Sequence, residues 1–209
     1  MANQAGPVCR LCRREGQKLF LKGEKCTSNC TFEKRNALLP GQHGLARRRK
    51  VSDYGLQLRA KQRARRLYGV LETQFRHYFE RAERSTGVTG TVLLQLLERR
   101  LDNIVYRLGL AASRREARQL VVHRHFAVNG RTVNIPSFQL RADDVVSVRD
   151  GSRKIVPIAN ASELRQGRPL PEWLSLGEDG LSGTIVRFPE RGEMDAFIDE
   201  QLIVEYYSR

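Results

Sequence analysis

The sequence predicts an α+β fold in which a helical body carries an N-terminal extension and a compact, inserted α/β module. Three observations carry this prediction. Apolar residues recur at helical spacing through much of residues 53–121, short β-like runs follow from residue 126 onward, and all four cysteines lie within residues 1–30. A chain of 209 residues is long enough for one large domain or two small ones.

Positive charge is concentrated at the start of the chain. The formal net charge is +14, and residues 1–66 hold 17 Lys and Arg against 4 Asp and Glu, a balance of +13. Such an excess repels itself unless a polyanion neutralises it, and nucleic acid is the usual polyanion. An anionic membrane surface is the competing partner. We expect neither secretion nor membrane association, because no signal-like segment, long apolar run or basic amphipathic helix with an aromatic face occurs.

The helical body is expected to follow a loop over residues 31–52 that ends in a cationic run. Ser52 or Asp53 can cap a helix to about Leu67, which Gly69 ends. Two more helices are expected over about residues 72–84, with one buried apolar stripe, and about 92–97. The first helix carries basic residues around most of its surface, and we expect these residues to contact RNA. They are Arg59, Lys61, Arg63, Arg65 and Arg66.

The segment from residue 99 to about residue 148 has a different pattern, in which helical spacing is followed by short β-like runs. Apolar residues over 101–108 repeat at helical spacing, and Ser113 with Glu116 forms a capping box that begins another helix. Asn129-Gly130 predicts a tight hairpin within residues 126–133, because both residues tolerate positive φ. The remaining expected elements are a strand at 145–148, a helix at 155–166, and strands at 184–188 and 202–207.

The four cysteines form two close pairs. Cys9 and Cys12 have C-x2-C spacing, and after thirteen intervening residues Cys26 and Cys30 have C-x3-C spacing. Each pair can place two thiolates on one tight turn, and basic neighbours favour the thiolate. The spacing predicts one zinc ion held by four cysteines; an iron–sulfur cluster, a disulfide pair and unligated thiols are the alternatives. His43 is not expected to be a ligand, because four cysteines suffice.

Two further arginine-rich segments are candidate RNA contacts. One is the cationic run Arg47, Arg48, Arg49 and Lys50, for which a solvated surface is the alternative. The other is the capped helix, where Arg114, Arg115 and Arg118 lie opposite the apolar face. Arg114 and Arg118 are i, i+4 neighbours, a spacing that is unfavourable for two cations and suggests an anion between them. Pairing with Glu116 and nearby acids is the alternative.

Two sets of short motifs run along the chain. The N-terminal half and the C-terminus carry Gly6-Pro7, Pro40-Gly41-Gln42-His43-Gly44, Ser52-Asp53-Tyr54-Gly55, Gln57-Leu58-Arg59, Lys61-Gln62, Tyr68-Gly69, Gln74-Phe75 and Tyr207-Ser208-Arg209. The middle of the chain carries Arg99-Arg100-Leu101-Asp102, Ser113-Arg114-Arg115, Ala117-Arg118-Gln119-Leu120, Val128-Asn129-Gly130 and Pro136-Ser137. With these motifs the chain resembles the bacterial small-subunit ribosomal proteins of the S-four family over essentially its whole length, and the middle set is similar to the RNA-binding module named after that family. The cysteine pairs resemble the zinc-containing branch of the family.

The resemblance implies a metal-binding, basic extension (1–52), a helical body (53–98), an inserted RNA-binding domain of the S-four type (99–163) and a C-terminal segment (164–209) that packs back on the helical body. It implies a primary binder of the 16S ribosomal RNA 5′ domain that nucleates subunit assembly. It also implies contact with ribosomal protein S-five, and with messenger RNA at the entry channel through residues 47–50, near which the protein contributes to translational accuracy. The module usually has glycines near positions 124 and 143, where this chain has Arg124 and Asp143.

Two other classes of protein fit parts of the pattern. An RNA-modifying enzyme can carry the same module, but it needs a separate catalytic domain, and we expect the sixty residues after the module to be too short for one. A zinc-dependent DNA-binding regulator needs a recognition helix and usually a dimerisation signal, which we do not find. We therefore expect a cytoplasmic structural protein of the small ribosomal subunit, with no catalytic residues and no small-molecule substrate.

Overall fold

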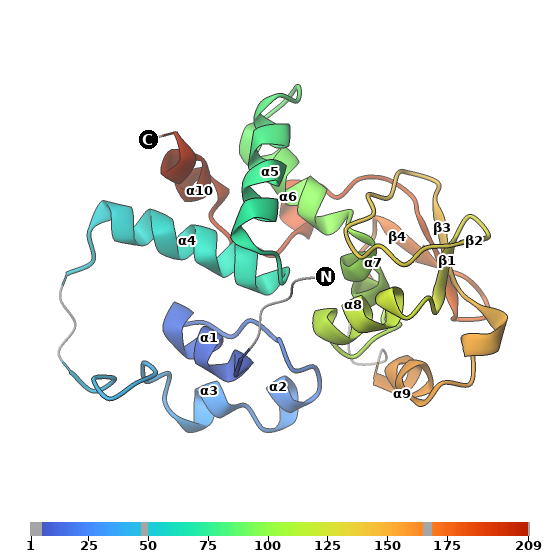
Figure 1. The fold of residues 1–209 in the computed structure, drawn as a ribbon, viewed down its shortest axis with the longest axis horizontal. Helices are drawn as coiled ribbons and strands as arrows, with labels where there is room; N and C mark the ends of the chain where they lie inside the picture. The colour runs from blue at the N-terminus through green and yellow to red at the C-terminus, as the bar shows by residue number, and fades with distance from the viewer. Residues whose placement is uncertain (1–5, 47–49, 165–168, 209) are drawn as a thin grey trace. The chain divides into compact units, whose positions relative to one another are not determined.

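The computed structural model describes residues 6–46, 50–164 and 169–208. Its contacts divide the chain into two compact units, residues 1–93 with 195–209 and residues 94–194 (Figure 1). The boundaries between these units follow residues 93 and 194, whereas we expected boundaries after residues 98 and 163. No helix in the described part of the chain is long and apolar enough to cross a membrane.

Short helices form the start of the first unit. They are α1 (Val8–Glu15), α2 (Lys25–Ser28) and α3 (Thr31–Lys34). Helix α1 ends at Gly16, whose φ of 66° gives the left-handed turn that glycine favours. The Arg13 guanidinium of α1 holds the loop that follows α3. Its Nε donates to the Leu38 carbonyl oxygen at 2.8 Å, and its Nη2 donates to the Leu39 carbonyl oxygen at 3.1 Å.

Longer helices build the helical body as the sequence predicts. They are α4 (Asp53–Leu67), α5 (Glu72–Glu83) and α6 (Thr89–Glu98). The Ser52 hydroxyl accepts a hydrogen bond from the Gly55 amide at 3.2 Å and caps α4. Phe75 and Phe79 on α5 are buried, which confirms the apolar stripe.

The C-terminal residues 202–207 form a helix, α10 (Glu200–Tyr207), and the predicted strand there is wrong. The Asp199 carboxylate caps this helix by accepting from the Leu202 amide at 3.3 Å. Helix α10 packs against α4, and the Tyr207 ring stacks on Phe79 with centroids 4.5 Å apart. The apolar positions 202, 203, 206 and 207 fit a helical face, and the acidic cap before them decides between helix and strand.

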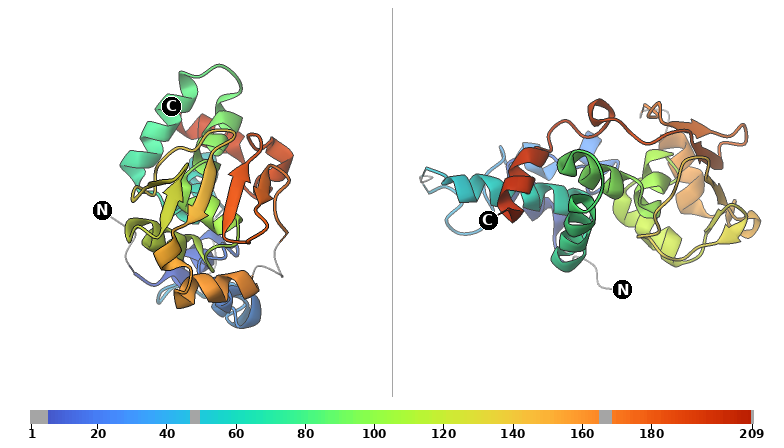
Figure 2. Two further views of the ribbon diagram at one scale, coloured as in Figure 1. Left: turned by 90° about the vertical axis from the view of Figure 1, so that its right-hand side faces the viewer. Right: turned by 90° about the horizontal axis from the view of Figure 1, so that it is seen from above.

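The second unit contains an antiparallel sheet with strand order β2-β1-β3-β5-β4 (Figure 2). The strands are β1 (Phe126–Val128), β2 (Arg131–Thr132), β3 (Val145–Val148), β4 (Leu174–Leu176) and β5 (Ser182–Ile185). Asn129 and Gly130 have φ of 48° and 78°, as the predicted Asn-Gly hairpin requires. Strands β4 and β5 thus belong to the sheet of the module. We expected these residues to be part of a C-terminal segment, 164–209, that packs on the helical body.

Helices α7 (Leu101–Arg107) and α8 (Arg114–Val122) form the core of this unit with the sheet. Leu108, at the end of α7, approaches β5 so closely that a Cβ on Gly183 would lie 2.4 Å from its Cδ2 atom. A short 3₁₀ helix, η1 (Asp150–Ser152), leads into α9 (Val156–Leu164), where the sequence predicts a helix over 155–166. Residues 165 and 166 lie beyond the range that the structure describes.

The two positions where the module usually has glycine keep a left-handed backbone without it. Arg124 has φ of 65° and Asp143 has φ of 67°. This conformation strains residues with a Cβ, although aspartate tolerates it better than arginine. The loop geometry is therefore retained in this chain at a conformational cost.

Candidate nucleic-acid interface

Helix α8 presents the predicted arginines, and the hydroxyl of Ser113 begins it. The Ser113 Oγ accepts from the Glu116 amide at 3.2 Å, as the capping box predicts. The Glu116 carboxylate instead accepts from the Ala112 amide at 2.6 Å, one residue before the expected partner. The opposite side of the helix is buried through Ala117, Leu120 and Val121. The arginines therefore sit on an element that is fixed at its start and along one face.

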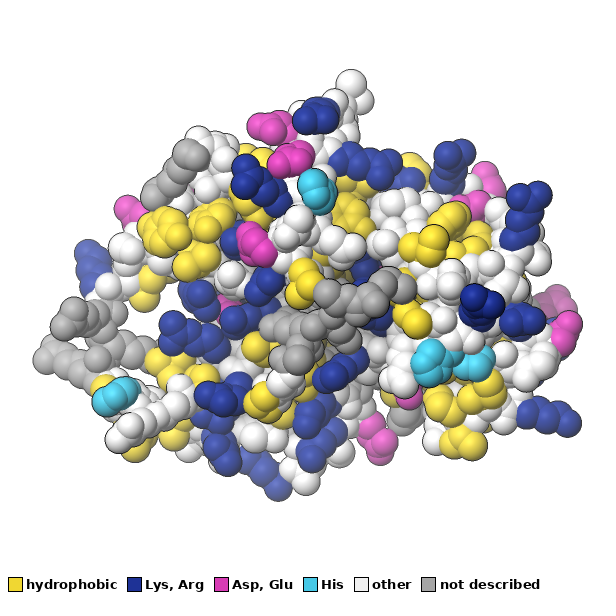
Figure 3. Space-filling model, viewed as in Figure 1, with side chains coloured by type: hydrophobic (Ala, Val, Ile, Leu, Met, Phe, Trp, Pro, Cys, Tyr) yellow, Lys and Arg dark blue, Asp and Glu magenta, His cyan; other side chains and the backbone are white. Residues whose placement is uncertain are grey.

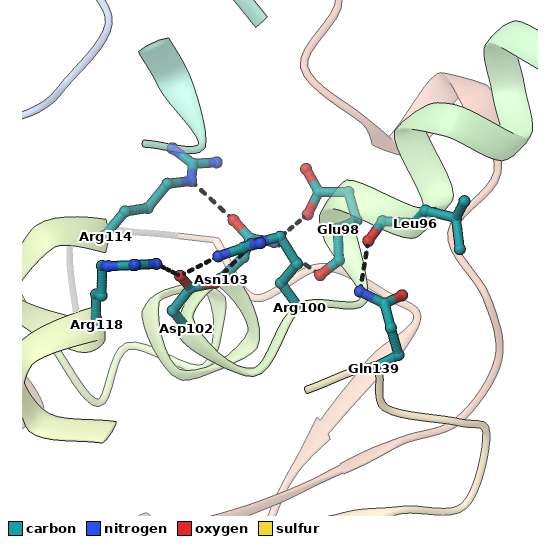
Figure 4. Close-up of polar contacts among 8 residues, drawn as sticks. All are labelled: Leu96, Glu98, Arg100, Asp102, Asn103, Arg114, Arg118 and Gln139. Atoms are coloured by element: carbon teal, nitrogen blue, oxygen red, sulfur yellow. Dashed lines mark hydrogen bonds and ion pairs between the residues drawn. The ribbon is translucent and has the colours of Figure 1, made fainter. Parts of the chain in front are cut away.

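Arg114 is held by the side chains of α7. Its Nε donates to the Asn103 Oδ1 at 2.8 Å (Figure 4). Its guanidinium carbon lies 4.6 Å from the centroid of the Tyr106 ring. A cation above a tyrosine face is stabilised by the ring quadrupole. Arg115, the next residue, is exposed.

Arg118 meets a buried ion pair. Arg100 is fully buried, and its Nε and Nη2 donate to the two carboxylate oxygens of Asp102 at 3.0 Å and 2.7 Å. The Arg118 Nη1 lies 3.4 Å from Asp102 Oδ2, on the same carboxylate (Figure 4). The structure thus places the Asp102 carboxylate beside Arg118 and a neutral amide beside Arg114. Only Arg118 pairs with a nearby acid, and Glu116, the other expected partner, accepts from the Ala112 amide instead.

The basic residues of α4 are largely engaged within the first unit. The Lys61 ammonium is buried, lies 2.6 Å from Glu72 Oε1 and sits 4.4 Å from the Tyr206 ring centroid. Arg59 and Arg66 both contact the buried Glu15 carboxylate of α1, and burial lowers the pKa of Arg66.

The remaining two α4 arginines also have partners in this unit. Arg65 contacts Gln62 at 2.9 Å, and Arg63 donates to the carbonyl oxygen of Phe197 at 3.5 Å. All five basic residues of α4, which we expect to contact RNA, therefore also have partners within the first unit.

Exposed cations of the first unit lie on or beside its N-terminal helices, and others lie on or beside α5 (Figure 3). The first group includes Arg10, Arg14, Lys22, Lys25, Lys34 and Arg35, and the second consists of Arg76, Arg81 and Arg84. Lys50 is exposed, as is His43. The predicted contacts Arg47, Arg48 and Arg49 lie outside the described residues.

The four cysteines line one small, partly enclosed pocket together with Lys18, Lys22, Lys25, Thr31 and Phe32. Burial raises the pKa of the Cys12 thiol, the Leu19 amide lowers it, and the charges of the other three cysteines raise it. The Lys22 amide donates to the Cys26 sulfur at 3.3 Å. Within the described residues, no three His, Cys, Asp or Glu side chains converge closely enough to hold a metal ion. The fold thus gathers both cysteine pairs at one place without forming a finished coordination sphere.

A second cluster of basic groups lies where α8 leads into β1. The rings of His123 and His125 are 6.1 Å apart, and His125 Nδ1 lies 3.0 Å from the Ser152 hydroxyl. Arg149 donates to the carbonyl oxygen of Arg124 at 3.1 Å. Burial lowers the pKa of His125, and the positive neighbours His123 and Arg149 lower it further.

Sequence reasoning missed the residues of α6 and α7 that hold the α8 arginines. Glu98, Asp102 and Asn103 are each almost fully buried although they are polar. Asp102 and Asn103 interrupt the apolar pattern of residues 101–108 at its first turn. A charged or amide side chain at an expected core position was the available signal, because buried polar groups require specific partners.

Comparison with known families gives two adjoining matches. Residues 3–98 match the model of the ribosomal protein S4/S9 N-terminal domain, and residues 99–146 match the model of the S4 domain. The first match covers the N-terminal and helical elements through α6. The second covers α7, α8, the hairpin and the start of β3.

Curated relatives match over their full length. The chain is 57% identical over 210 residues to the small ribosomal subunit protein uS4 of Natranaerobius thermophilus, and 60% identical over 213 residues to the uS4A protein of Symbiobacterium thermophilum. It is 55% identical over 210 residues to the uS4 protein of Acidobacterium capsulatum. In each case the match covers 100% of both chains.

Proposed function

Because the chain belongs to the bacterial uS4 family of small-subunit ribosomal proteins, we propose that it is a structural constituent of the small ribosomal subunit that binds ribosomal RNA. The observation that carries the proposal is the full-length similarity to uS4 proteins, which includes both matched domains. The matched relatives are ribosomal proteins and not enzymes, so no catalytic residue is assigned. Its place of action is the ribosome in the cytoplasm.

The RNA contacts are proposed to centre on Arg114, Arg115 and Arg118. A guanidinium has donors in a planar fork that suits phosphate oxygens, and a rigid helix can match a fixed phosphate geometry in folded RNA. The network from α7 supports this role, because it holds two of the three arginines in place. Exposed cations of the N-terminal helices add sequence-independent attraction through release of counterions.

Finer parts of the proposal rest on the family resemblance of the motifs. We propose that the RNA is the 5′ domain of 16S ribosomal RNA and that early binding there nucleates assembly. We also propose contact with ribosomal protein S-five and, through residues 47–50, with messenger RNA at the entry channel, where the protein contributes to translational accuracy. The exposed Lys50 is compatible with that last contact.

The cysteine pocket is proposed to hold one zinc ion through Cys9, Cys12, Cys26 and Cys30. The donor chemistry supports this proposal, because four thiolates satisfy tetrahedral zinc and all four cysteines line the same pocket. Their side chains would have to move closer together than in this structure to coordinate one ion. The ion, when bound, would supply a cross-link for a segment with little hydrophobic core. An iron–sulfur cluster uses the same donor set and is the alternative.

The experiment that tests ribosomal function is co-sedimentation with a binding titration. Tagged protein in its own cells should run with the small subunit in a sucrose gradient, and purified protein should retain a transcript of the 16S 5′ domain on filters. A transcript of equal length from large-subunit RNA is the matched control. Protein that stays at the top of the gradient and binds both transcripts equally would contradict the proposal.

A further inference from the structure

The side-chain amide of Asn103 has only one orientation that satisfies its surroundings. Its Nδ2 donates to the backbone carbonyl oxygen of Glu98 at 2.9 Å and to the Glu98 Oε2 at 2.6 Å. Both amide hydrogens are therefore used by acceptors. Turning the amide over would bring its oxygen against two acceptors and its NH₂ group against a guanidinium. The Oδ1 atom is thus fixed toward Arg114, whose Nε lies 2.8 Å away (Figure 4).

The Glu98 carboxylate is itself fixed. Its side chain is 1% exposed, and the Arg107 guanidinium holds both of its oxygens, with Nη2 at 2.7 Å from Oε1 and Nε at 3.1 Å from Oε2. A buried carboxylate with a bidentate arginine partner keeps its charge and its direction. Asn103 therefore stands between a rigid buried ion pair and the Nε edge of Arg114.

We infer that Asn103 is a positioning residue for the RNA contact of Arg114, an inference that rests on the proposed function. The Asn103 oxygen holds the Nε of the guanidinium, and the Tyr106 ring lies against its plane at 4.6 Å. These two contacts restrict the rotation of a long side chain before any RNA is bound. Pre-ordering a contact group reduces the entropy that is lost on binding.

The same geometry distinguishes Asn103 from an amide that only supports the fold. Gln139 also lies in this unit, and its Nε2 donates to the backbone carbonyl oxygen of Leu96, on the same helix α6, at 3.1 Å (Figure 4). Among the described residues, no hydrogen bond joins the Gln139 side chain to an arginine of α8. Gln139→Ala therefore serves as a matched control, because it removes an amide-to-carbonyl bond to α6.

A double-mutant cycle on the full-length protein tests the inference, with a transcript of small-subunit ribosomal RNA as the probe. We expect Asn103→Ala to weaken binding by about three- to tenfold, and to have little further effect when Arg114→Ala is already present. We also expect Asn103→Ala to flatten the dependence of the logarithm of affinity on the logarithm of salt concentration, as if one phosphate contact were lost. Affinities refer to the folded fraction, measured by circular dichroism.

The outcomes separate the inference from the proposed function. Equal effects of Asn103→Ala with and without Arg114→Ala, or an unchanged salt dependence, would overturn the positioning role while wild-type binding stands. Wild-type protein that does not bind the transcript would contradict the proposed function itself. Gln139→Ala should change stability without changing the affinity of the folded protein or its salt dependence. Should Asn103→Ala fail to fold, Asn103→Ser leaves a smaller cavity and enters the same cycle with the same expected coupling.

Discussion

Arg100 and Asp102 form a bidentate ion pair inside the second unit, with Nε–Oδ1 at 3.0 Å and Nη2–Oδ2 at 2.7 Å. Arg100 is 0% exposed and Asp102 is 4% exposed, so neither charge is solvated by bulk water. Arg100 precedes α7 and Asp102 lies in its first turn. Arg118 of α8 also approaches the Asp102 carboxylate. These buried charges therefore contact one another and an arginine of the candidate RNA surface, and they do not face solvent.

Loss of this carboxylate should be strongly destabilising. Asp102→Ala leaves the buried Arg100 charge without its partner, and we expect the free energy of unfolding to fall by about 3–5 kcal/mol. Asp150→Ala is the matched control, because Asp150 pairs with Arg153 at 2.8 Å while its own side chain is 91% exposed. That change should cost less than about 1 kcal/mol. Urea unfolding followed by circular dichroism measures both, and similar losses would contradict the importance of burial.

The left-handed backbone at Arg124 gives a second prediction. Arg124→Gly removes a Cβ from a residue with φ of 65°, and we expect a gain in stability of up to about 1 kcal/mol. Arg124→Ala removes the same charge but keeps the Cβ, so it should show no such gain. Asp143→Gly should gain less, since aspartate tolerates this conformation better. Thermal unfolding ranks the variants, and an Arg124→Ala protein as stable as Arg124→Gly would show that charge, not backbone strain, is responsible.

The pH dependence of stability should carry a contribution from His125. Burial and the neighbouring His123 and Arg149 lower the pKa of His125 below its ordinary value of 6.5. The unfolded chain then binds more protons than the folded chain just below pH 6.5, so stability falls as the pH falls through that window. His125→Asn should flatten this fall in urea unfolding between about pH 7.5 and about pH 5. His77→Asn, at an exposed histidine of α5, is the control, and an equal flattening there would contradict the assignment.

The proposed zinc site predicts metal content and its effect on stability. Purified protein should contain about one equivalent of zinc per chain by elemental analysis, and chelation should lower the unfolding temperature. Cys26→Ser should lower the metal content, whereas Thr31→Ala, at the same pocket, should not. Iron with brown colour would identify a cluster instead. Absence of any metal in protein taken from assembled subunits would contradict both forms of the site.

The sequence predicted the local elements better than their assembly. Helix α4, the Ser113 cap and the hairpin at Asn129-Gly130 were correct because each depends on local chemistry: an N-cap, a capping serine and positive φ. The strand at 202–207 was wrong because a short apolar run fits either structure until its cap and its packing partner are known. The placement of β5 beside β3 depends on contacts between distant residues, which periodicity does not encode.

The candidate site was predicted in the same uneven way. The α8 arginines could be named from a charged face opposite an apolar one. The polar side chains of Asn103 and Asp102 at core positions were a signal that they have specific partners. Which arginines they contact could not be predicted, because only the packing of α7 against α8 brings them together. Gathering of the four cysteines in one pocket agrees with the predicted pairing, and whether a metal binds there stays a prediction.

The final prediction concerns two groups of cations in the first unit, namely exposed lysines and arginines that pair with carboxylates. Lys22, Lys25 and Lys34 are exposed on or beside the N-terminal helices. Exposed lysines attract an RNA backbone by displacing its counterions, and each lost phosphate contact reduces the salt slope of binding by up to about 0.9. We therefore expect the triple change of these lysines to glutamine to reduce the slope by about two units or more.

The matched control removes three charges that already have carboxylate partners. Arg59 and Arg66 contact Glu15, and Arg65 lies 3.7 Å from Glu72. Their replacement by glutamine should reduce stability, because α4 loses its ties to α1 and α5, while the salt slope of the folded protein changes by less than one unit. Filter binding to the 16S 5′-domain transcript at several salt concentrations, with the folded fraction measured in parallel, compares the two triples. A larger loss of slope in the α4 triple would show that RNA competes successfully for these arginines and that their ion pairs open on binding.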